Sequence, residues 1–232
     1  MDILEFKEAL SDLGIDVTSD DLFKLNRYYE LLIEWNEKIN LTAITLRKQV
    51  YLKHFYDSLT LVKCIDLNKC ESLCDLGTGA GFPGIVLKIF FPHLKLTLVD
   101  ALNKRIKFLK VVMDELGLED VSLVHARAEE YARENREVFD VVTARAVASI
   151  PILLEYGIPL VKVNGLLCAM RGNDDSSGCE NALDKLNCKL DKIVSFKLPI
   201  EDSNRTLIKF IKCGKTNMKY PRKYADMKKK TL

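Results

Sequence analysis

The feature that most constrains this chain is the glycine-rich stretch Asp75-Leu-Gly-Thr-Gly-Ala-Gly-Phe-Pro-Gly84. A short apolar run, 72–76, leads into it, and a helical pattern, 85–91, follows it. Glycine residues allow positive φ angles and let a ligand approach the main chain closely. The start of the following helix presents unpaired N–H groups and the positive end of the helix dipole. The stretch therefore predicts a strand, a tight turn and a helix start that can bind a ligand, although a plain tight turn would use the same residues.

An acidic residue ends each of the first two predicted strands. Asp75 could hold an amine or fix the glycine loop, and Asp100 follows the strand-like run 94–99. In α/β folds that bind nucleotides, the acid after the second strand accepts hydrogen bonds from ribose hydroxyls. Residues 79–84 also match the dinucleotide fingerprint G-x-G-x-x-G, so a nicotinamide-dependent oxidoreductase is one alternative. Together the two segments resemble motifs I and II of the class I S-adenosylmethionine-dependent methyltransferases.

The pattern of apolar residues divides the chain into three parts. Helical spacing in 2–13, 18–35 and 47–62 predicts an N-terminal helical cap over residues 1–66. Strands and helices then alternate, which is typical of a parallel, doubly wound sheet. The expected strands are 72–76, 95–99, 121–124, 138–143, 165–170, 190–198 and 205–213, and the expected helices are 84–91, 103–116, 128–134, 151–160 and 176–188. No helical pattern separates the last two strands, so we expect a Rossmann-like, seven-stranded, mostly parallel sheet over 67–214 and a basic tail over 215–232.

Composition narrows the class of protein. The chain has 232 residues, of which 48% are hydrophobic and 29% charged, as in ordinary soluble globular proteins. Its seven cysteines form no C-x-x-C pair, and none lies at ligand spacing from a histidine, so reduced thiols and no metal site are expected. No apolar run approaches membrane-spanning length, and the N-terminus lacks a signal-peptide pattern. We therefore expect a cytoplasmic protein that functions as a monomer.

The charge of the chain is unevenly distributed. The formal net charge is only +2, but residues 205–232 carry ten Lys and Arg residues against one acidic residue. Such an imbalance favours a surface that binds a polyanion such as RNA, although a solvated basic tail is the alternative. The candidate RNA-binding residues are Lys104, Arg105, Arg171, Lys219, Arg222, Lys223, Lys228, Lys229 and Lys230.

The residues after the fourth predicted strand, Thr143-Ala-Arg-Ala146, bear on the reaction. Enzymes that methylate exocyclic amines of bases usually carry Asn/Asp-Pro-Pro-aromatic at this point, and those that methylate pyrimidine C5 need a cysteine nucleophile. The chain has no Asn/Asp-Pro-Pro motif after this strand, and none of its prolines is followed by a cysteine, the Pro-Cys arrangement in which that nucleophile often lies. Guanine N7 has its own lone pair and no proton to lose, so methyl transfer to it is a direct displacement in which positioning supplies most of the rate.

Several motifs together resemble one family, the bacterial small-subunit ribosomal RNA guanine-N7 methyltransferases, also called glucose-inhibited division protein B. The motifs are Glu34-Trp-Asn-Glu-Lys-Ile-Asn-Leu-Thr42, His54-Phe-Tyr-Asp-Ser58, the glycine-rich stretch, Asp100 with Lys104-Arg105, and Thr143-Ala-Arg-Ala-Val-Ala148. The resemblance implies a guanine in the 530-loop of 16S ribosomal RNA, alone or in the small subunit, as the target. It also implies S-adenosylmethionine as the cofactor. The implied cofactor-binding residues are Asp75, Gly77, Gly79, Gly81, Phe82, Asp100, Ala128, Glu129 and Arg145.

The roles of single residues stay open at this stage. Arg145 could bind the cofactor carboxylate, donate to guanine O6, or form a salt bridge at the sheet edge. His54 and Asp57, three residues apart on one helical face, could line a guanine pocket or tie the cap to the sheet. Phe82 could pack on an adenine, and Glu129 could contact its polar edge or cap a helix. These residues make Arg145, His54 and Asp57 the catalytic candidates, with a catalytically inactive RNA-binding protein as a further alternative.

Overall fold

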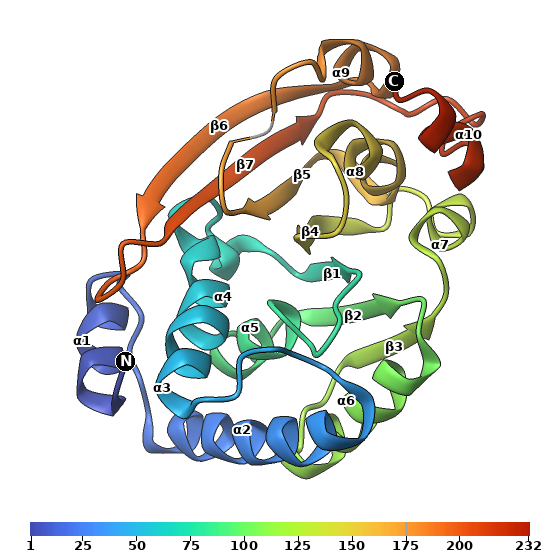
Figure 1. The fold of residues 1–232 in the computed structure, drawn as a ribbon. Helices are drawn as coiled ribbons and strands as arrows, with labels where there is room; N and C mark the ends of the chain where they lie inside the picture. Colours follow the sequence, from blue (N-terminus) through green and yellow to red (C-terminus); the bar gives the residue numbers. More distant parts are fainter. Residues whose placement is uncertain (175) are drawn as a thin grey trace.

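The core of the molecule is a seven-stranded sheet (Figure 1), seen in a computed structural model that describes residues 1–174 and 176–232. The strands are β1 (Ser72–Leu76), β2 (Lys95–Asp100), β3 (Val121–His125), β4 (Phe139–Arg145), β5 (Val161–Arg171), β6 (Cys188–Lys197) and β7 (Asn204–Lys212). Their order is β3-β2-β1-β4-β5-β7-β6. The first five strands are parallel, and β7 is antiparallel to both of its neighbours, β5 and β6. The predicted mostly parallel sheet is therefore confirmed.

Several element boundaries differ from the prediction, and three of the differences have a cause in the backbone conformation. β5 begins at Val161 rather than 165, because Val161 pairs with Phe139 before a register shift at which Asn164 takes a positive φ of 69°. The helix expected over 176–188 is shorter, α9 (Glu180–Leu186), because Asn187 adopts a left-handed conformation. β6 therefore starts at Cys188, two residues before the predicted strand.

Helices cover both faces of the sheet (Figure 1). The remaining α-helices are α1 (Ile3–Ser11), α2 (Ser19–Ile39), α3 (Arg47–Val50), α4 (Asp57–Leu59), α5 (Gly84–Phe90), α6 (Asn103–Leu116), α7 (Ala128–Glu134), α8 (Ile150–Gly157) and α10 (Tyr224–Lys229). Short 3-10 turns lie at Thr60–Lys63, Leu67–Lys69 and Ile158–Leu160. One hydrophobic core lies between the sheet and α1, α2, α5 and α6, and a second lies between the sheet and α7, α8, α9 and α10. Among the helices that the structure describes, none is long and apolar enough to cross a membrane.

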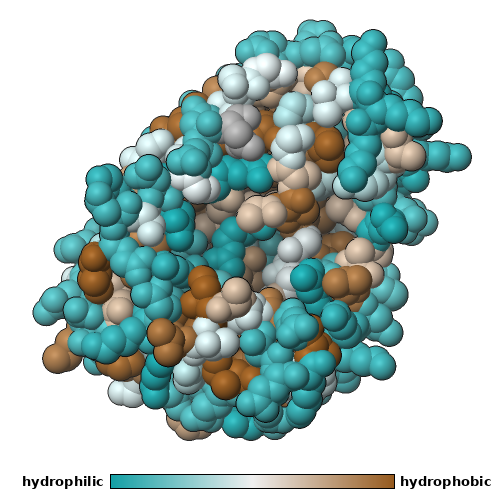
Figure 2. Space-filling model, in the orientation of Figure 1, coloured by the Kyte–Doolittle hydropathy of each residue, from teal (hydrophilic) through white to brown (hydrophobic). Residues whose placement is uncertain are grey.

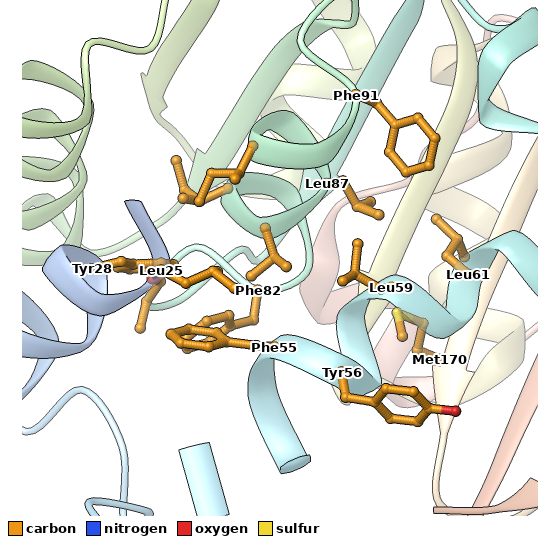
Figure 3. Close-up of a cluster of buried hydrophobic side chains, with 14 of the residues drawn as sticks. Leu25, Tyr28, Phe55, Tyr56, Leu59, Leu61, Phe82, Leu87, Phe91 and Met170 are labelled. Atoms are coloured by element: carbon orange, nitrogen blue, oxygen red, sulfur yellow. Dashed lines mark hydrogen bonds between the residues drawn. The ribbon is translucent and has the colours of Figure 1, made fainter. Parts of the chain in front are cut away.

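The N-terminal helices form the predicted cap and pack on α5. Capping boxes at Asp2 and Thr18 start α1 and α2, since each side chain accepts a backbone N–H that the helix cannot bond itself. The predicted apolar stripe of α2 buries Leu25 and Tyr28 against the glycine loop and α5 (Figure 3). The helix ends at Ile39, because Asn40 adopts a left-handed conformation. Asn36 fixes the chain that follows, since its Oδ1 accepts hydrogen bonds from the backbone N–H groups of Leu41 and Thr42 at 2.7 and 2.8 Å.

The third helical stretch of the cap is continuous but not uniform. Between α3 and α4 the chain forms a π-helical segment, Tyr51–Tyr56, instead of the regular helix predicted over 47–62. π-helical turns are rare in proteins, and those that occur often lie at functional sites. This segment contains His54, and Asp57 follows it directly.

The helix start after the glycine loop should tolerate no side chain at Gly84. A Cβ atom there would lie 2.9 Å from Asp75 Oδ2 and would also overlap the Leu98 side chain. We expect Gly84→Ala to lower the free energy of unfolding by about 1–3 kcal/mol, because well-packed cores resist added atoms. Gly214→Ala is the matched control, since its nearest contact is an ordinary 3.7 Å to Asn187 Cβ. Urea unfolding measures both, and equal stability of the two variants would contradict the packing described here.

Candidate active site

The side chain of Asp75 fixes the conformation of the glycine loop. This carboxylate is fully buried at the end of β1, and its Oδ2 accepts hydrogen bonds from Thr78 Oγ1 at 2.7 Å and from the N–H of Gly84 at 2.9 Å. Burial raises the pKa of Asp75 to about 6. Its Oδ1 has no hydrogen-bond partner among the residues that the structure describes. Asp75 was predicted either to hold an amine or to fix the glycine loop, and these hydrogen bonds show that it fixes the loop.

Above the loop lies a cavity of about 190 Å³ at the carboxyl ends of β1 to β4. In open α/β sheets, this is the edge at which ligands bind. Figure 2 shows the corresponding face, with a hollow near the place where Figure 1 has the ends of β1 and β4. The lining residues are Gly77, Val99, Asp100, Ala101, Ala126, Arg127, Ala128, Glu129, Val147, Ala148, Tyr156 and Tyr224. Four of the predicted cofactor-binding residues, at positions 77, 100, 128 and 129, are among them.

The chemistry of the cavity fits S-adenosylmethionine. Asp100 and Glu129 bring two nearly buried carboxylates to it, and both are acceptors of the kind that ribose hydroxyls and an adenine amino group need. Asp100 is already oriented, because it accepts hydrogen bonds from the N–H of Gly79 at 2.9 Å and from Arg105 Nη1 at 3.1 Å. Gly77 has a φ of +66° and allows the Val147 side chain to approach the loop, since a Cβ atom at position 77 would lie only 2.9 Å from it.

The other five predicted cofactor residues, Asp75, Gly79, Gly81, Phe82 and Arg145, are not part of this lining. A Cβ on Gly81 would meet Tyr28 Oη at 2.6 Å, so this glycine allows close packing of the cap on the loop. The Phe82 ring, expected against an adenine, is buried in the core beside Tyr28 and Phe55 (Figure 3) and is not part of the cavity lining. The reason is that the cap buries this ring between α2 and the π-helical segment, an interaction that no local pattern reveals.

The predicted trio Arg145, His54 and Asp57 meets above Phe82. Arg145 Nη2 lies 3.1 Å from His54 Nδ1, and its Nη1 donates to Lys53 O at 3.1 Å and lies 3.5 Å from Asp57 Oδ2. The guanidinium also lies over the Phe82 ring, 5.1 Å from its centroid, while the His54 ring stacks on Phe82 at 4.5 Å. Arg145 therefore joins the end of β4 to the cap.

Arg205 completes this network and was missed in the sequence, where it appeared only as the first residue of the basic C-terminal region. It lies on β7, and its Nε donates to Asp57 Oδ1 at 3.0 Å. Asp57 thus lies between two guanidinium groups, with Oδ2 facing Arg145 and Oδ1 facing Arg205. The only signal would have been the antiparallel return of β7 to the edge of β5, which places the start of β7 near the cap.

A second cavity, of about 300 Å³, opens beside this network. Its lining residues are Ile44, Lys53, Asp57, Arg145, Ala146, Met170, Arg171, Gly172, Arg205 and Leu207. The segment after β4 separates the two cavities: Arg145 and Ala146 line this one, whereas Val147 and Ala148 line the other. Ala146 takes a left-handed φ of 54°, which is uncommon for a residue with a Cβ and turns the chain between the cavities.

The contacts of His54 fix its tautomer. An arginine side chain only donates, so His54 Nδ1 accepts from Arg145, and Nε2 carries the proton toward Thr42 Oγ1 at 2.9 Å. Burial and the charge of Arg145 lower the pKa of His54 to about 3. The ring is therefore neutral at physiological pH, and both of its nitrogens are engaged.

The predicted RNA-binding residues fall into two groups. Lys104, Lys219, Lys223, Lys228, Lys229 and Lys230 are exposed. Arg105 pairs with Asp100, Arg171 donates to the carbonyl of Ala148, and Arg222 forms a bidentate pair with Glu155. The arginines of the set thus hold parts of the fold, while the lysines remain at the surface. Among residues 1–174 and 176–232, no group of three or more His, Cys, Asp or Glu side chains could hold a metal ion.

We expect the NMR resonances of the His54 ring to show no titration between pH 8 and pH 5. The unfolded chain takes up this proton near pH 6.5, whereas the folded chain takes it up only near pH 3. Neutral His54 therefore contributes stability that is present above pH 6.5 and is lost as the pH falls toward 3. A His54→Gln variant assigns the resonance, and a titration midpoint near 6.5 would contradict the buried, arginine-paired ring.

Comparisons with known proteins agree with this geometry. The family model "GidB: rRNA small subunit methyltransferase G" matches residues 21–208. The curated Ribosomal RNA small subunit methyltransferase G of Geobacillus sp. (strain WCH70) is 51% identical over 228 residues and covers 96% of both chains. That of Bacillus subtilis (strain 168) is 46% identical and covers 96% of this chain and 95% of its own.

Solved structures share the fold at low sequence identity. MtNAS, in complex with MTA and tNA, has a TM-score of 0.55 and 16% identity, and the match covers 83% of this chain and 74% of that one. The YcgJ protein from Bacillus subtilis has a TM-score of 0.54 and 13% identity, with 69% and 100% coverage. The family model and the full-length relatives show that this chain belongs to the rRNA small subunit methyltransferase G family, whose methyl donor is S-adenosylmethionine.

Proposed function

We propose that this chain methylates N7 of a guanine in the 530-loop of 16S ribosomal RNA. The observation that carries the proposal is the second cavity, which Arg145 lines, while Val147 and Ala148 of the same segment line the cofactor cavity. The names of the relatives support ribosomal RNA of the small subunit as the substrate class. Membership of a methyltransferase family leaves the oxidoreductase alternative without support.

The network around Arg145 favours a reaction that needs no general base. His54 accepts from Arg145 at one nitrogen and faces Thr42 with the other. Asp57 directs one oxygen to each of two arginines. Neither group is therefore free to remove a proton, and a guanine N7, which has a lone pair and no proton, requires none. When bound, S-adenosylmethionine supplies an electrophilic methyl group on its sulfonium sulfur.

The chain's own residues would bind and orient the base. Guanine presents O6 and N7 as neighbouring acceptors. If Arg145 donates to O6 alone, N7 stays free to attack the methyl group, and the Phe82 and His54 rings hold the guanidinium in place. Met170 and Leu207 give the same cavity apolar surface for the face of a base. In this scheme Arg145 is the catalytic residue, while His54 and Asp57 position it rather than transfer protons.

Binding of the RNA strand requires cations at the second cavity and on the surface around it. Lys53, Arg171 and Arg205 surround the second cavity. The exposed lysines at 104, 223 and 228–230 extend positive charge over the surface. Contacts to phosphates of this kind weaken steeply with salt because counterions are released on binding. We propose that these lysines bind the ribosomal RNA around the target guanine.

We further propose that the protein acts as a monomer. Its place of action would be the cytoplasm, where ribosomal subunits assemble.

The proposal predicts transfer of a labelled methyl group to small subunits from cells that lack this activity, at one guanine in the 530-loop. Cleavage chemistry specific for 7-methylguanine, read by primer extension, identifies the atom and the position. We expect Arg145→Ala to lower kcat/KM about 10²-fold, because a base that is no longer held at O6 is misplaced relative to the methyl group.

Three controls support the interpretation of this assay. Lys110→Ala removes an exposed pair with Asp114, so it should leave activity and stability unchanged. Circular dichroism and cofactor affinity show whether Arg145→Ala still folds. RNA with 7-deazaguanine at the target should accept no methyl group. Methylation of that RNA would overturn the N7 assignment, whereas binding of RNA and cofactor without any transfer would favour the inactive RNA-binding alternative.

A further inference from the structure

The C-terminal segment, residues 215–232, is packed into the body of the protein rather than extended from it. Arg136 on the loop after α7 donates to the carbonyls of Tyr220 and Thr216 at 2.6 and 2.7 Å. Met227 is fully buried in the core that the sheet forms with α7 and α8, and Leu232 is nearly so. Figure 1 shows α10 beside α7 and α8.

One buried charge pair sets the position of this segment. Glu155 of α8 is 1% exposed, and its carboxylate accepts hydrogen bonds from the N–H of Arg222 at 2.9 Å and from the Arg222 side chain at 2.7 and 2.7 Å. Bidentate arginine–carboxylate pairs combine charge with a fixed geometry. The pair therefore fixes the chain two residues before Tyr224, the first residue of α10.

Tyr224 reaches the cofactor cavity. It lines the same space as Asp100, Ala128 and Glu129, the residues whose chemistry suits the ribose and the adenine. Two of the described lining residues are aromatic, Tyr156 and Tyr224. The side chain of Tyr156 is 3% exposed and belongs to the core, whereas Tyr224 is only partly buried and packs on the edge of that core.

We propose that Tyr224 forms the aromatic wall of the cofactor cavity against which the adenine ring packs, with the Arg222–Glu155 pair as its support. This contact would supply the stacking that Phe82 cannot, since Phe82 packs under Arg145 on the other side of the loop. Lys228 covers one face of the Tyr224 ring at 5.3 Å, which holds the ring from the α10 side. The inference concerns cofactor binding alone and holds whichever RNA atom accepts the methyl group.

Calorimetry on the full-length protein tests this assignment with two ligands. S-adenosylhomocysteine and 5′-methylthioadenosine share the adenine and ribose, but only the first carries the amino-acid end. We expect Tyr224→Ala to weaken both by a similar factor of about ten, as stacking between a base and an aromatic ring predicts. Tyr224→Phe should retain affinity, because the ring rather than the hydroxyl makes the contact. Lys215→Ala, which changes an exposed side chain of the same C-terminal segment, is the matched control.

Two other results of the calorimetry would overturn the proposal. Wild-type affinity of Tyr224→Ala for both ligands would exclude the contact, and a loss limited to S-adenosylhomocysteine would place Tyr224 at the amino-acid end. If Tyr224→Ala does not fold, Tyr224→Leu keeps apolar bulk without a flat ring and should show the same loss. As a readout independent of affinity, saturating S-adenosylhomocysteine should slow tryptic cleavage after Lys223 in the wild type, and an unchanged cleavage rate would contradict the wall.

Discussion

The contact between Arg145 and the cap determines how the rest of the site is arranged. A parallel sheet with a glycine loop can bind a cofactor by itself, but it has no second wall for a substrate. Arg145 supplies the connection, because it extends from the end of β4 to Lys53 O, His54 and Asp57 of the cap. Its side chain is only 19% exposed, and desolvation lowers the pKa of Arg145 from the ordinary value, so the guanidinium depends on Asp57 for compensation. The second cavity opens beside these contacts.

The two cavities share one segment of chain, and their charges differ. Asp100 and Glu129 give the first cavity carboxylate acceptors, while Lys53, Arg171 and Arg205 give the second a positive rim. Hydroxyl and amino donors therefore suit the first, and a polyanion suits the second. The left-handed Ala146 turns the chain so that successive residues face opposite cavities. In the proposed reaction, the cofactor and the base would therefore occupy cavities that neighbouring residues of one segment line.

The fold, and four of the residues that line the first cavity, could be predicted from the sequence because their signals are local. Alternating apolar runs give the strands, and the positions after strands identify Asp100, Ala128 and Glu129 by their place in the chain. Contacts between distant elements gave no such signal. Phe82 is drawn into the core by α2, and Arg205 reaches Asp57 across 148 residues. Residues 222 and 224 belong to a segment that composition alone described as a basic tail, although its arginine pairs with a buried glutamate and its tyrosine lines a cavity.

The most direct test of the account is a crystal structure of the protein with S-adenosylhomocysteine bound. The account predicts the ribose hydroxyls on Asp100, the adenine between Ala128 and Tyr224, and the sulfur directed past Ala146 toward the space beside Arg145. That result would place the methyl donor between the two cavities. A ligand seated in the cavity beside Arg145 and Arg205, or one whose sulfur points away from Ala146, would contradict the division of the site into a cofactor cavity and a base cavity.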